Sequence, residues 1–158
     1  MLSSNTKMCE GIENLSIERM TSSDLEQVVE IENQSFSDPW TKDNFVSESN
    51  NQVTLFLVAK SNQRVIGYAC VWIIIDEVHI GNLAVASEYR KKGIGEKLLK
   101  EVFKQAEEKN AKFATLEVRA SNSAAINLYK KYGFVEERKR KNYYRNPIED
   151  ALVMIKNF

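Results

Sequence analysis

Residues 83–96 read Leu-Ala-Val-Ala-Ser-Glu-Tyr-Arg-Lys-Lys-Gly-Ile-Gly-Glu and join a predicted strand to the longest predicted helix. Gly93 and Gly95, two of the six glycines in the chain, stand where that helix begins. A helix N-terminus presents unpaired N–H groups and a positive dipole end, and glycine lets a pyrophosphate approach the backbone closely. The stretch therefore predicts a phosphate-binding loop. The alternative is a basic helix start that binds no ligand.

Two other phosphate-binding patterns do not fit this stretch. A Rossmann fingerprint needs a third glycine at a fixed place and a strand early in the chain. A P-loop needs Gly-Lys-Ser or Gly-Lys-Thr, whereas Gly95 is followed by Glu96. Neither nucleotide-binding fold is expected.

Strands and helices alternate on both sides of the loop. Hydrophobic periodicity and turn residues predict strands over residues 15–20, 53–60, 64–75, 77–85, 113–118, 134–141 and 150–156. They predict helices over residues 21–35, 41–48, 93–109 and 124–131. This order predicts an α/β fold with a mixed sheet covered by helices on both faces. We expect one domain over residues 15–158, after a frayed tail over residues 1–14.

Composition excludes several classes of protein. The 158 residues include 22 Lys plus Arg and 22 Asp plus Glu, so no net charge draws the chain to nucleic acid or a membrane. The longest uncharged run, residues 65–75, is too short to span a bilayer, and the start lacks the apolar segment of a signal peptide. Cys9 and Cys70 have no metal-ligand spacing, so we expect no metal, no disulfide framework and a cytoplasmic setting.

A second motif makes the pattern specific. Residues 116–134 read Leu-Glu-Val-Arg-Ala-Ser-Asn-Ser-Ala-Ala-Ile-Asn-Leu-Tyr-Lys-Lys-Tyr-Gly-Phe. Together with residues 90–95, this stretch resembles the GNAT superfamily. More narrowly, it resembles the ribosomal-protein-alanine N-acetyltransferases (the RimI type). The similarity covers about residues 15–155, and Asn142-Tyr143-Tyr144 near the end belongs to it.

The resemblance implies a mostly antiparallel sheet of about seven strands and acetyl-coenzyme A as co-substrate. In this family the strand ending at residue 85 binds the pantetheine arm through its backbone, and the 91–96 loop holds the pyrophosphate. Asn122 would contact the cofactor from the far side, although it could simply cap the following helix. The cofactor-binding residues implied are Leu83, Ala84, Val85, Arg90, Lys91, Lys92, Gly93, Ile94, Gly95, Glu96, Asn122 and Tyr129.

The same resemblance makes Glu117 the general base and Tyr129 the general acid. An ammonium cannot attack a thioester, so a base must take a proton, and the departing thiolate is best protonated as it leaves. With both substrates held together, direct attack needs no covalent enzyme intermediate. The alternatives are an exposed Glu117 paired with Arg119 and a Tyr129 that only packs in the core.

His79, the only histidine of the chain, is a secondary catalytic candidate. Some related N-terminal acetyltransferases have a histidine at the matching place, but a structural role is also open. We predict Glu117 as the main base, with its pKa raised by burial. The reason is that the sequence shows no neighbour that would orient His79.

Five further residues are candidates for substrate binding: Glu32, Phe36, Trp40, Tyr143 and Tyr144. The aromatic ones stand in predicted loops, over residues 36–40 and 142–144, at positions that line the peptide groove in this family. Ordinary packing is the alternative. Glu32 falls on the apolar stripe of the first helix and is either a groove carboxylate or, as we favour, a rim residue. The basic block 138–141 is either a solvated strand end or a contact for RNA or an acidic partner.

We therefore expect a cytoplasmic enzyme, monomeric or weakly dimeric, that acetylates the N-terminal α-amine of a protein. The family's favoured target is a ribosomal protein, and neither a membrane nor direct nucleic-acid binding is required. The alternatives are an enzyme that acetylates lysine or a small-molecule amine, a non-catalytic acyl-coenzyme A-binding module, and an RNA-associated protein. Glu117 and Tyr129 together argue against the binding module, which needs neither.

Overall fold

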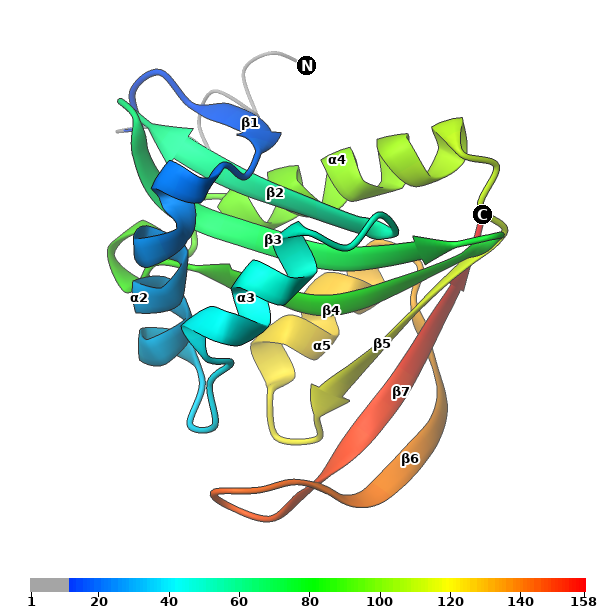
Figure 1. Cartoon of the computed structure of the whole chain (residues 1–158). Helices are drawn as coiled ribbons and strands as arrows, with labels where there is room; N and C mark the ends of the chain where they lie inside the picture. The colour runs from blue at the N-terminus through cyan, green and yellow to red at the C-terminus, as the bar shows by residue number, and fades with distance from the viewer. Residues whose placement is uncertain (1–11) are drawn as a thin grey trace.

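A computed structural model describes residues 12–158, which form a seven-stranded sheet between two helical layers (Figure 1). The strands are β1 (Ser16–Arg19), β2 (Thr54–Ser61), β3 (Arg64–Ile74), β4 (Glu77–Val85), β5 (Phe113–Arg119), β6 (Val135–Tyr144) and β7 (Glu149–Asn157). The helices are α2 (Leu25–Ser35), α3 (Lys42–Ser49), α4 (Ile94–Glu108) and α5 (Ser123–Lys131), with short 3₁₀ turns η1 (Ser22–Asp24) and η2 (Ser87–Tyr89). The predicted order of strands and helices is confirmed.

The sheet is mixed but mostly antiparallel. Its strand order is β1-β2-β3-β4-β5-β7-β6, and β4 and β5 form the parallel pair. A parallel pair needs a long crossover connection, and α4 provides it. The predicted fold class is therefore confirmed.

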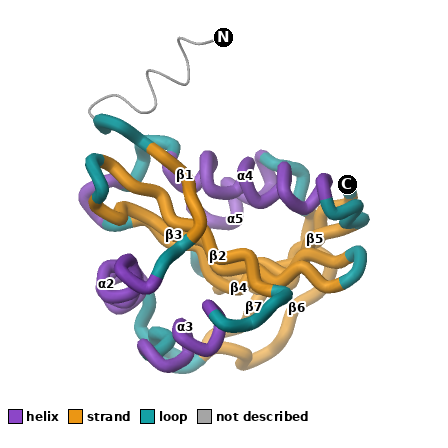
Figure 2. Tube along the Cα trace, turned by 45° about the horizontal axis from the view of Figure 1, so that its top comes forward, coloured by secondary structure: helices purple, strands orange, loops and turns teal. Residues whose placement is uncertain are grey.

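The two helical layers cover opposite faces of the sheet (Figure 2). On one face, α4 buries Ile94, Leu98, Leu99, Val102 and Ala106, the apolar stripe that the sequence predicts. On the other face, α2 and α3 pack on β2, β3 and β4 through a second core cluster that contains Val28, Phe45 and Tyr68. No helix in the described part of the chain is long and apolar enough to cross a membrane.

The sheet opens between β4 and β5, as Figure 1 shows. Paired positions run from Glu77 opposite Phe113 to Ile80 opposite Leu116 and then stop. Beyond that point β4 continues along β3, and β5 continues along β7. The strand register is irregular at Gly81, where a Cβ would lie 2.6 Å from the ring of Trp72, so glycine is required there. The edge of β4 that follows Gly81 is therefore exposed toward the gap.

One prediction needs correction, and another falls mostly outside the described residues. Residues 142–144 belong to β6 rather than to a loop, because Tyr144 still pairs with Glu149 of β7. Residues 1–11 of the predicted tail lie outside the described residues. Just after them, Ser61 Oγ at the end of β2 donates to the Glu13 carbonyl at 2.8 Å, and Asn14 Nδ2 donates to Asn62 Oδ1 at 2.6 Å.

Candidate active site

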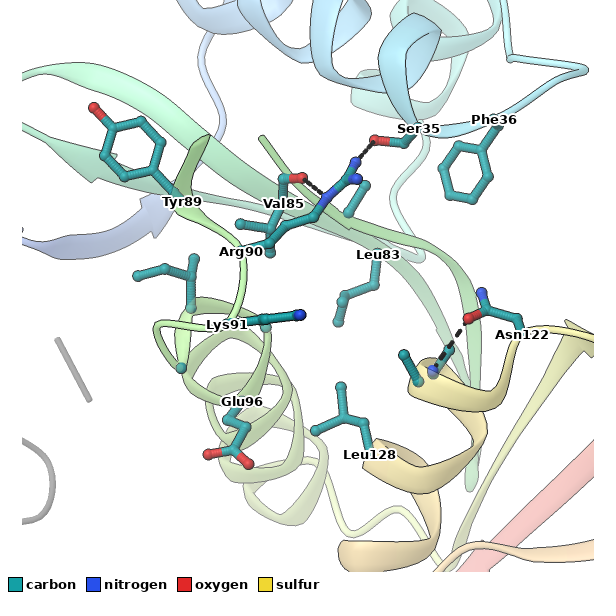
Figure 3. A pocket seen from close by; sticks show the side chains of 16 residues that line it. Ser35, Phe36, Leu83, Val85, Tyr89, Arg90, Lys91, Glu96, Asn122 and Leu128 are labelled. Atoms are coloured by element: carbon teal, nitrogen blue, oxygen red, sulfur yellow. Dashed lines mark hydrogen bonds between the residues drawn. The ribbon is translucent and has the colours of Figure 1, made fainter. Parts of the chain in front are cut away.

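A cleft of about 580 Å³ lies between the start of α4, the end of β4 and α5 (Figure 3). It brings together most of the predicted cofactor residues: Leu83, Ala84, Val85, Arg90, Lys91, Gly93, Ile94, Gly95, Glu96 and Asn122. Lys92 and Tyr129 do not line it. Its lining also includes Phe36 and five residues that the sequence analysis missed: Ser35, Tyr89, Ala124, Ala125 and Leu128. The three from α5 share one helical face, which a periodicity search around Asn122 could have found.

The backbone at the start of α4 is shaped to receive an anion. Gly93 caps the helix with φ of 84°, and Lys91 also has a positive φ of 62°. Gly93 reaches this conformation at little cost, and the first-turn N–H groups of α4 have no partner within the helix. Figure 3 shows the Lys91 side chain pointing into the cleft.

Gly95 leaves space in the floor of the cleft. A Cβ at this position would lie 3.7 Å from Leu83 and 3.8 Å from both Leu128 and Val85, which is ordinary contact. The fold could therefore accept a side chain here, so packing does not require the glycine. The missing Cβ keeps open a hollow between three apolar side chains.

The side chains of two predicted cofactor-binding residues are engaged elsewhere. Arg90 donates from Nε to the Val85 carbonyl at 2.9 Å and from Nη2 to Ser35 Oγ at 3.1 Å (Figure 3). Glu96 accepts from Lys131 Nζ of α5 at 2.6 Å. Arg90 therefore braces β4 against α2, and Glu96 links α4 to α5. Both residues still line the cleft.

Asn122 combines the two roles that the sequence left open. Its Oδ1 accepts a hydrogen bond from Ala125 N at 3.2 Å, so it caps α5. It also lines the cleft opposite α4.

Glu117 stands where the sheet opens, one residue beyond the last β4–β5 pair. Its Oε2 lies 3.0 Å from His79 Nε2, and its Oε1 accepts from Arg140 Nη1 at 3.4 Å. The hydrogen bond with His79, and to a lesser extent Arg140, lowers the pKa of Glu117 although burial opposes this. The predicted upward shift is wrong, and so is the alternative pairing with Arg119, which binds Glu149 at 3.2 Å.

His79 does have the neighbours that the sequence could not show. Its Nδ1 lies 3.2 Å from Thr115 Oγ1, and its ring lies 5.4 Å from the ring of Trp72, centroid to centroid. Thr115 in turn donates to Glu77 Oε1 at 3.3 Å. These contacts follow from the register, which sets His79 opposite Trp72 on β3 and Thr115 on β5.

Tyr129 is 8% exposed, and its ring packs edge-on against Phe134 with centroids 5.5 Å apart. Burial raises its pKa to about 12, so the hydroxyl keeps its proton at neutral pH. Burial also raises the pKa of Tyr144, and the negative charge of Glu117 raises it further, while Arg119 opposes this. Tyr144 therefore lies within electrostatic reach of Glu117.

The aromatic residues predicted for a substrate groove flank this centre. Phe36 lines the cleft, and Trp40 packs against Trp72 with ring centroids 5.9 Å apart. On the other side, Arg140 lies over the exposed ring of Tyr143 at 4.4 Å, and Arg119 lies over Tyr144 at 4.6 Å.

Arg119 joins the two flanks. It donates to Ser37 Oγ in the α2–α3 loop at 3.3 Å and to the Arg145 carbonyl in the β6–β7 turn at 2.7 Å. Arg119 therefore links the α2–α3 loop, which carries Phe36 and Trp40, to the β6–β7 turn, which follows Tyr143 and Tyr144.

Glu32 is not a rim residue, and the structure corrects that prediction. It is 1% exposed and accepts hydrogen bonds from the Trp40 backbone N–H, Asn82 Nδ2 and the Tyr68 hydroxyl. Burial raises its pKa to about 7. Three donors meet the buried carboxylate, and this position excludes direct contact with a substrate in this structure.

The basic block 138–141 lies on β6, at the edge of the sheet, with its side chains exposed. Arg140 turns toward the centre and binds Glu117. One residue of the block, Arg140, therefore belongs to the candidate site.

The fold and the cleft define an acetyl-coenzyme A-dependent N-acetyltransferase, and comparison with known proteins agrees. The model of the Acetyltransferase (GNAT) family matches residues 25–134. The chain belongs to this family, which confirms the resemblance in its sequence.

Relatives place the chain more narrowly within the family. It is 33% identical over 140 residues to the ribosomal protein bS18-alanine N-acetyltransferase of Escherichia coli (strain K12), covering 87% of this chain and 94% of that protein. It is 41% identical over 139 residues to a Bacillus subtilis (strain 168) protein provisionally given the same name, covering 87% and 92%. The crystal structure of the Escherichia coli ribosomal-protein-S18-alanine N-acetyltransferase superposes with a TM-score of 0.85 at 32% identity, covering 90% and 93%.

Proposed function

We propose that this chain acetylates the N-terminal α-amine of a ribosomal protein that begins with alanine, in the cytoplasm, with residues 15–158 acting as a single catalytic domain. The observation that carries this proposal is the opening between β4 and β5. A cleft suited to the cofactor lies beside it, and Glu117 and His79 stand at its closed end. The names of the Escherichia coli and Bacillus subtilis relatives support the target.

The residues of the cleft fit acetyl-coenzyme A. The free edge of β4 offers backbone groups to an extended chain with amides, and Leu83, Val85 and Leu128 offer an apolar floor. The N–H groups at the start of α4, with Lys91, suit a pyrophosphate. The cofactor supplies an activated acetyl thioester when it is bound.

In the proposed reaction, Glu117 accepts a proton from the substrate ammonium, so that the amine can attack directly. His79 and Arg140 hold the carboxylate in place and keep it charged. Tyr129, protonated at neutral pH, donates its proton to the sulfur as the C–S bond breaks. It regains a proton from the nitrogen, which loses its second proton as the amide forms.

The chemistry of the base favours an α-amine over lysine. An α-amine has a pKa of about 8 and a lysine side chain about 10.4, so freeing the α-amine costs about 3 kcal/mol less at neutral pH. A carboxylate whose own pKa is lowered is a weak base and suits the easier of the two deprotonations. We propose that an extended N-terminal segment binds between the two aromatic flanks, which Arg119 links through Ser37 and the Arg145 carbonyl.

The test uses purified ribosomal protein bS18 with a free N-terminus as the acceptor. After incubation with the chain and acetyl-coenzyme A, mass spectrometry of its peptides should locate the acetyl group on the terminal alanine. A variant of bS18 that begins with proline, a secondary amine, is the matched control and should stay unmodified. Acetyl groups on lysines with a free N-terminus would contradict the proposal.

A further inference from the structure

Glu32 is a buried acidic residue that the proposed reaction does not use. It lies on α2, four residues before Phe36, and its carboxylate faces β3 and β4. A buried carboxylate is costly unless its hydrogen bonds are made, and this one receives three. The fold therefore maintains a specific polar cluster where an apolar side chain would suffice for packing.

The three donors come from three different segments. Trp40 N–H, 3.1 Å from Oε1, belongs to the α2–α3 loop, and Asn82 Nδ2, 2.8 Å from the same oxygen, belongs to β4. The Tyr68 hydroxyl, from β3, donates to Oε2. One oxygen thus joins the loop to the strand.

The joined segments are both parts of the site. Asn82 follows Gly81, where β4 leaves β5 and its free edge begins. The loop carries Phe36, which lines the cleft, and Trp40, which packs on Trp72 beside His79. A change in the Glu32 contacts would therefore alter the distance between the loop and the strand edge.

We propose that Glu32 is a positioning residue, which sets the groove by fixing the α2–α3 loop to β4 through the Trp40 and Asn82 hydrogen bonds. This inference rests on the proposed function, since it assumes that the substrate N-terminus enters beside this loop. Glu32 acts through the loop and touches neither substrate.

We call the Trp40 and Asn82 hydrogen bonds to Glu32 Oε1 the clamp. The clamp needs an oxygen that accepts both hydrogen bonds, and it does not need a charge. The hydrogen-bond donors to Glu32 in the described part of the chain are a backbone N–H, an amide and a hydroxyl, and none of them is a cation. Burial raises the pKa of Glu32 to about 7, so the neutral form is accessible near neutrality. A glutamine can keep the clamp, because its oxygen accepts from Trp40 and Asn82 while its amide donates to the Tyr68 hydroxyl.

The test compares Glu32→Met, which removes the acceptors at similar volume, with Glu32→Gln, which keeps them. Glu32→Met should raise the KM for an Ala-starting peptide by roughly 10- to 100-fold, as expected for a misplaced positioning element. Its affinity for acetyl-coenzyme A, measured by calorimetry, should change less than the peptide KM, because the start of α4 and Lys91 lie outside the joined segments. Hydrogen exchange should be faster at the Trp40 amide and unchanged at the Val102 amide in α4. Glu32→Gln should resemble the wild type in all three.

If Glu32→Met shows the wild-type exchange rate at the Trp40 amide and the wild-type KM for the peptide, the clamp proposal is wrong. So would a Glu32→Gln variant as impaired as Glu32→Met, because charge rather than acceptor geometry would then matter. The exchange measurement needs no turnover. If the wild-type enzyme fails to acetylate the peptide, the proposed function fails, and Trp40 exchange still decides the clamp.

Discussion

The two sides of the gap between β4 and β5 are built in different ways. The cofactor side comes mainly from two short stretches, residues 83–96 and 122–128, with Ser35 and Phe36 beside them. The catalytic side is made of long polar and aromatic side chains that come from β3, β4, β5 and β6 and meet through strand register. Substitutions on the first side should therefore change cofactor affinity, and substitutions on the second should change turnover.

The largest effect is expected on the catalytic side, at Glu117. Glu117→Gln cannot take the ammonium proton, so turnover of an Ala-starting peptide should fall by roughly 10²- to 10⁴-fold. Because His79 and Arg140 lower the pKa of Glu117 from its usual 4.5, its carboxylate form persists at neutral pH. An acidic limb due to Glu117 should therefore lie below pH 4.5. Glu137→Gln, on the exposed strand β6, is the control and should keep wild-type turnover.

Tyr129 comes next and separates catalysis from core packing. Tyr129→Phe keeps the ring against Phe134 and removes the hydroxyl, so turnover should fall by roughly 10²-fold. Calorimetry should show nearly unchanged affinity for acetyl-coenzyme A. Wild-type turnover in this variant would leave Tyr129 with a packing role alone.

A smaller effect is expected on the cofactor side, at Gly95. Gly95→Val fills the hollow between Leu83, Val85 and Leu128, so the Kd for acetyl-coenzyme A should rise about tenfold or more, equivalent to about 1.4 kcal/mol. The melting temperature should stay close to that of the wild type, because a Cβ at this position makes only ordinary van der Waals contacts. Gly93 is a poorer choice, because its φ of 84° would strain any replacement. An unchanged Kd would contradict the assignment of the phosphate loop.

The last effect is on folding stability rather than on activity and comes from Glu32, which lies between the two sides. A carboxyl whose pKa rises on folding makes the folded state bind more protons, so stability is lost as pH rises from 4.5 to about 7. The loss should be on the order of 3 kcal/mol, seen as a falling midpoint in urea titrations. Glu32→Gln should flatten this dependence, whereas Glu30→Gln, exposed on the same helix, should keep it. A wild-type slope in Glu32→Gln would contradict the burial of the charge.

The cofactor side could be predicted because its residues are close together in the chain. Glycines at a helix start, a basic run and a capping asparagine indicate a phosphate loop before any tertiary contact is known. The apolar stripe of α4 and the order of the strands were likewise predictable from periodicity. Arg90 was the exception, because its partner Ser35 lies far away in the sequence.

On the catalytic side, the sequence predicted individual residues but not the contacts between them. His79 and Glu117 meet because β4 and β5 pair in parallel, and Arg140 reaches Glu117 across β7. No local pattern encodes these registers, so the neighbours of His79 and the lowered pKa of Glu117 were missed. Glu32 was misplaced because exposure is the usual state of a glutamate, although its position on an apolar stripe was the signal of burial.

One competition experiment tests the central claim most directly. An Ala-starting peptide without lysine and an N-terminally blocked peptide with one free lysine are mixed at equal concentration with the enzyme and limiting acetyl-coenzyme A. Mass spectrometry then measures the acetyl group on each. The lower cost of freeing an α-amine predicts acetylation of the Ala-starting peptide and almost none of the lysine peptide. Equal acetylation of both, or preference for the lysine, would contradict the N-terminal specificity on which the account depends.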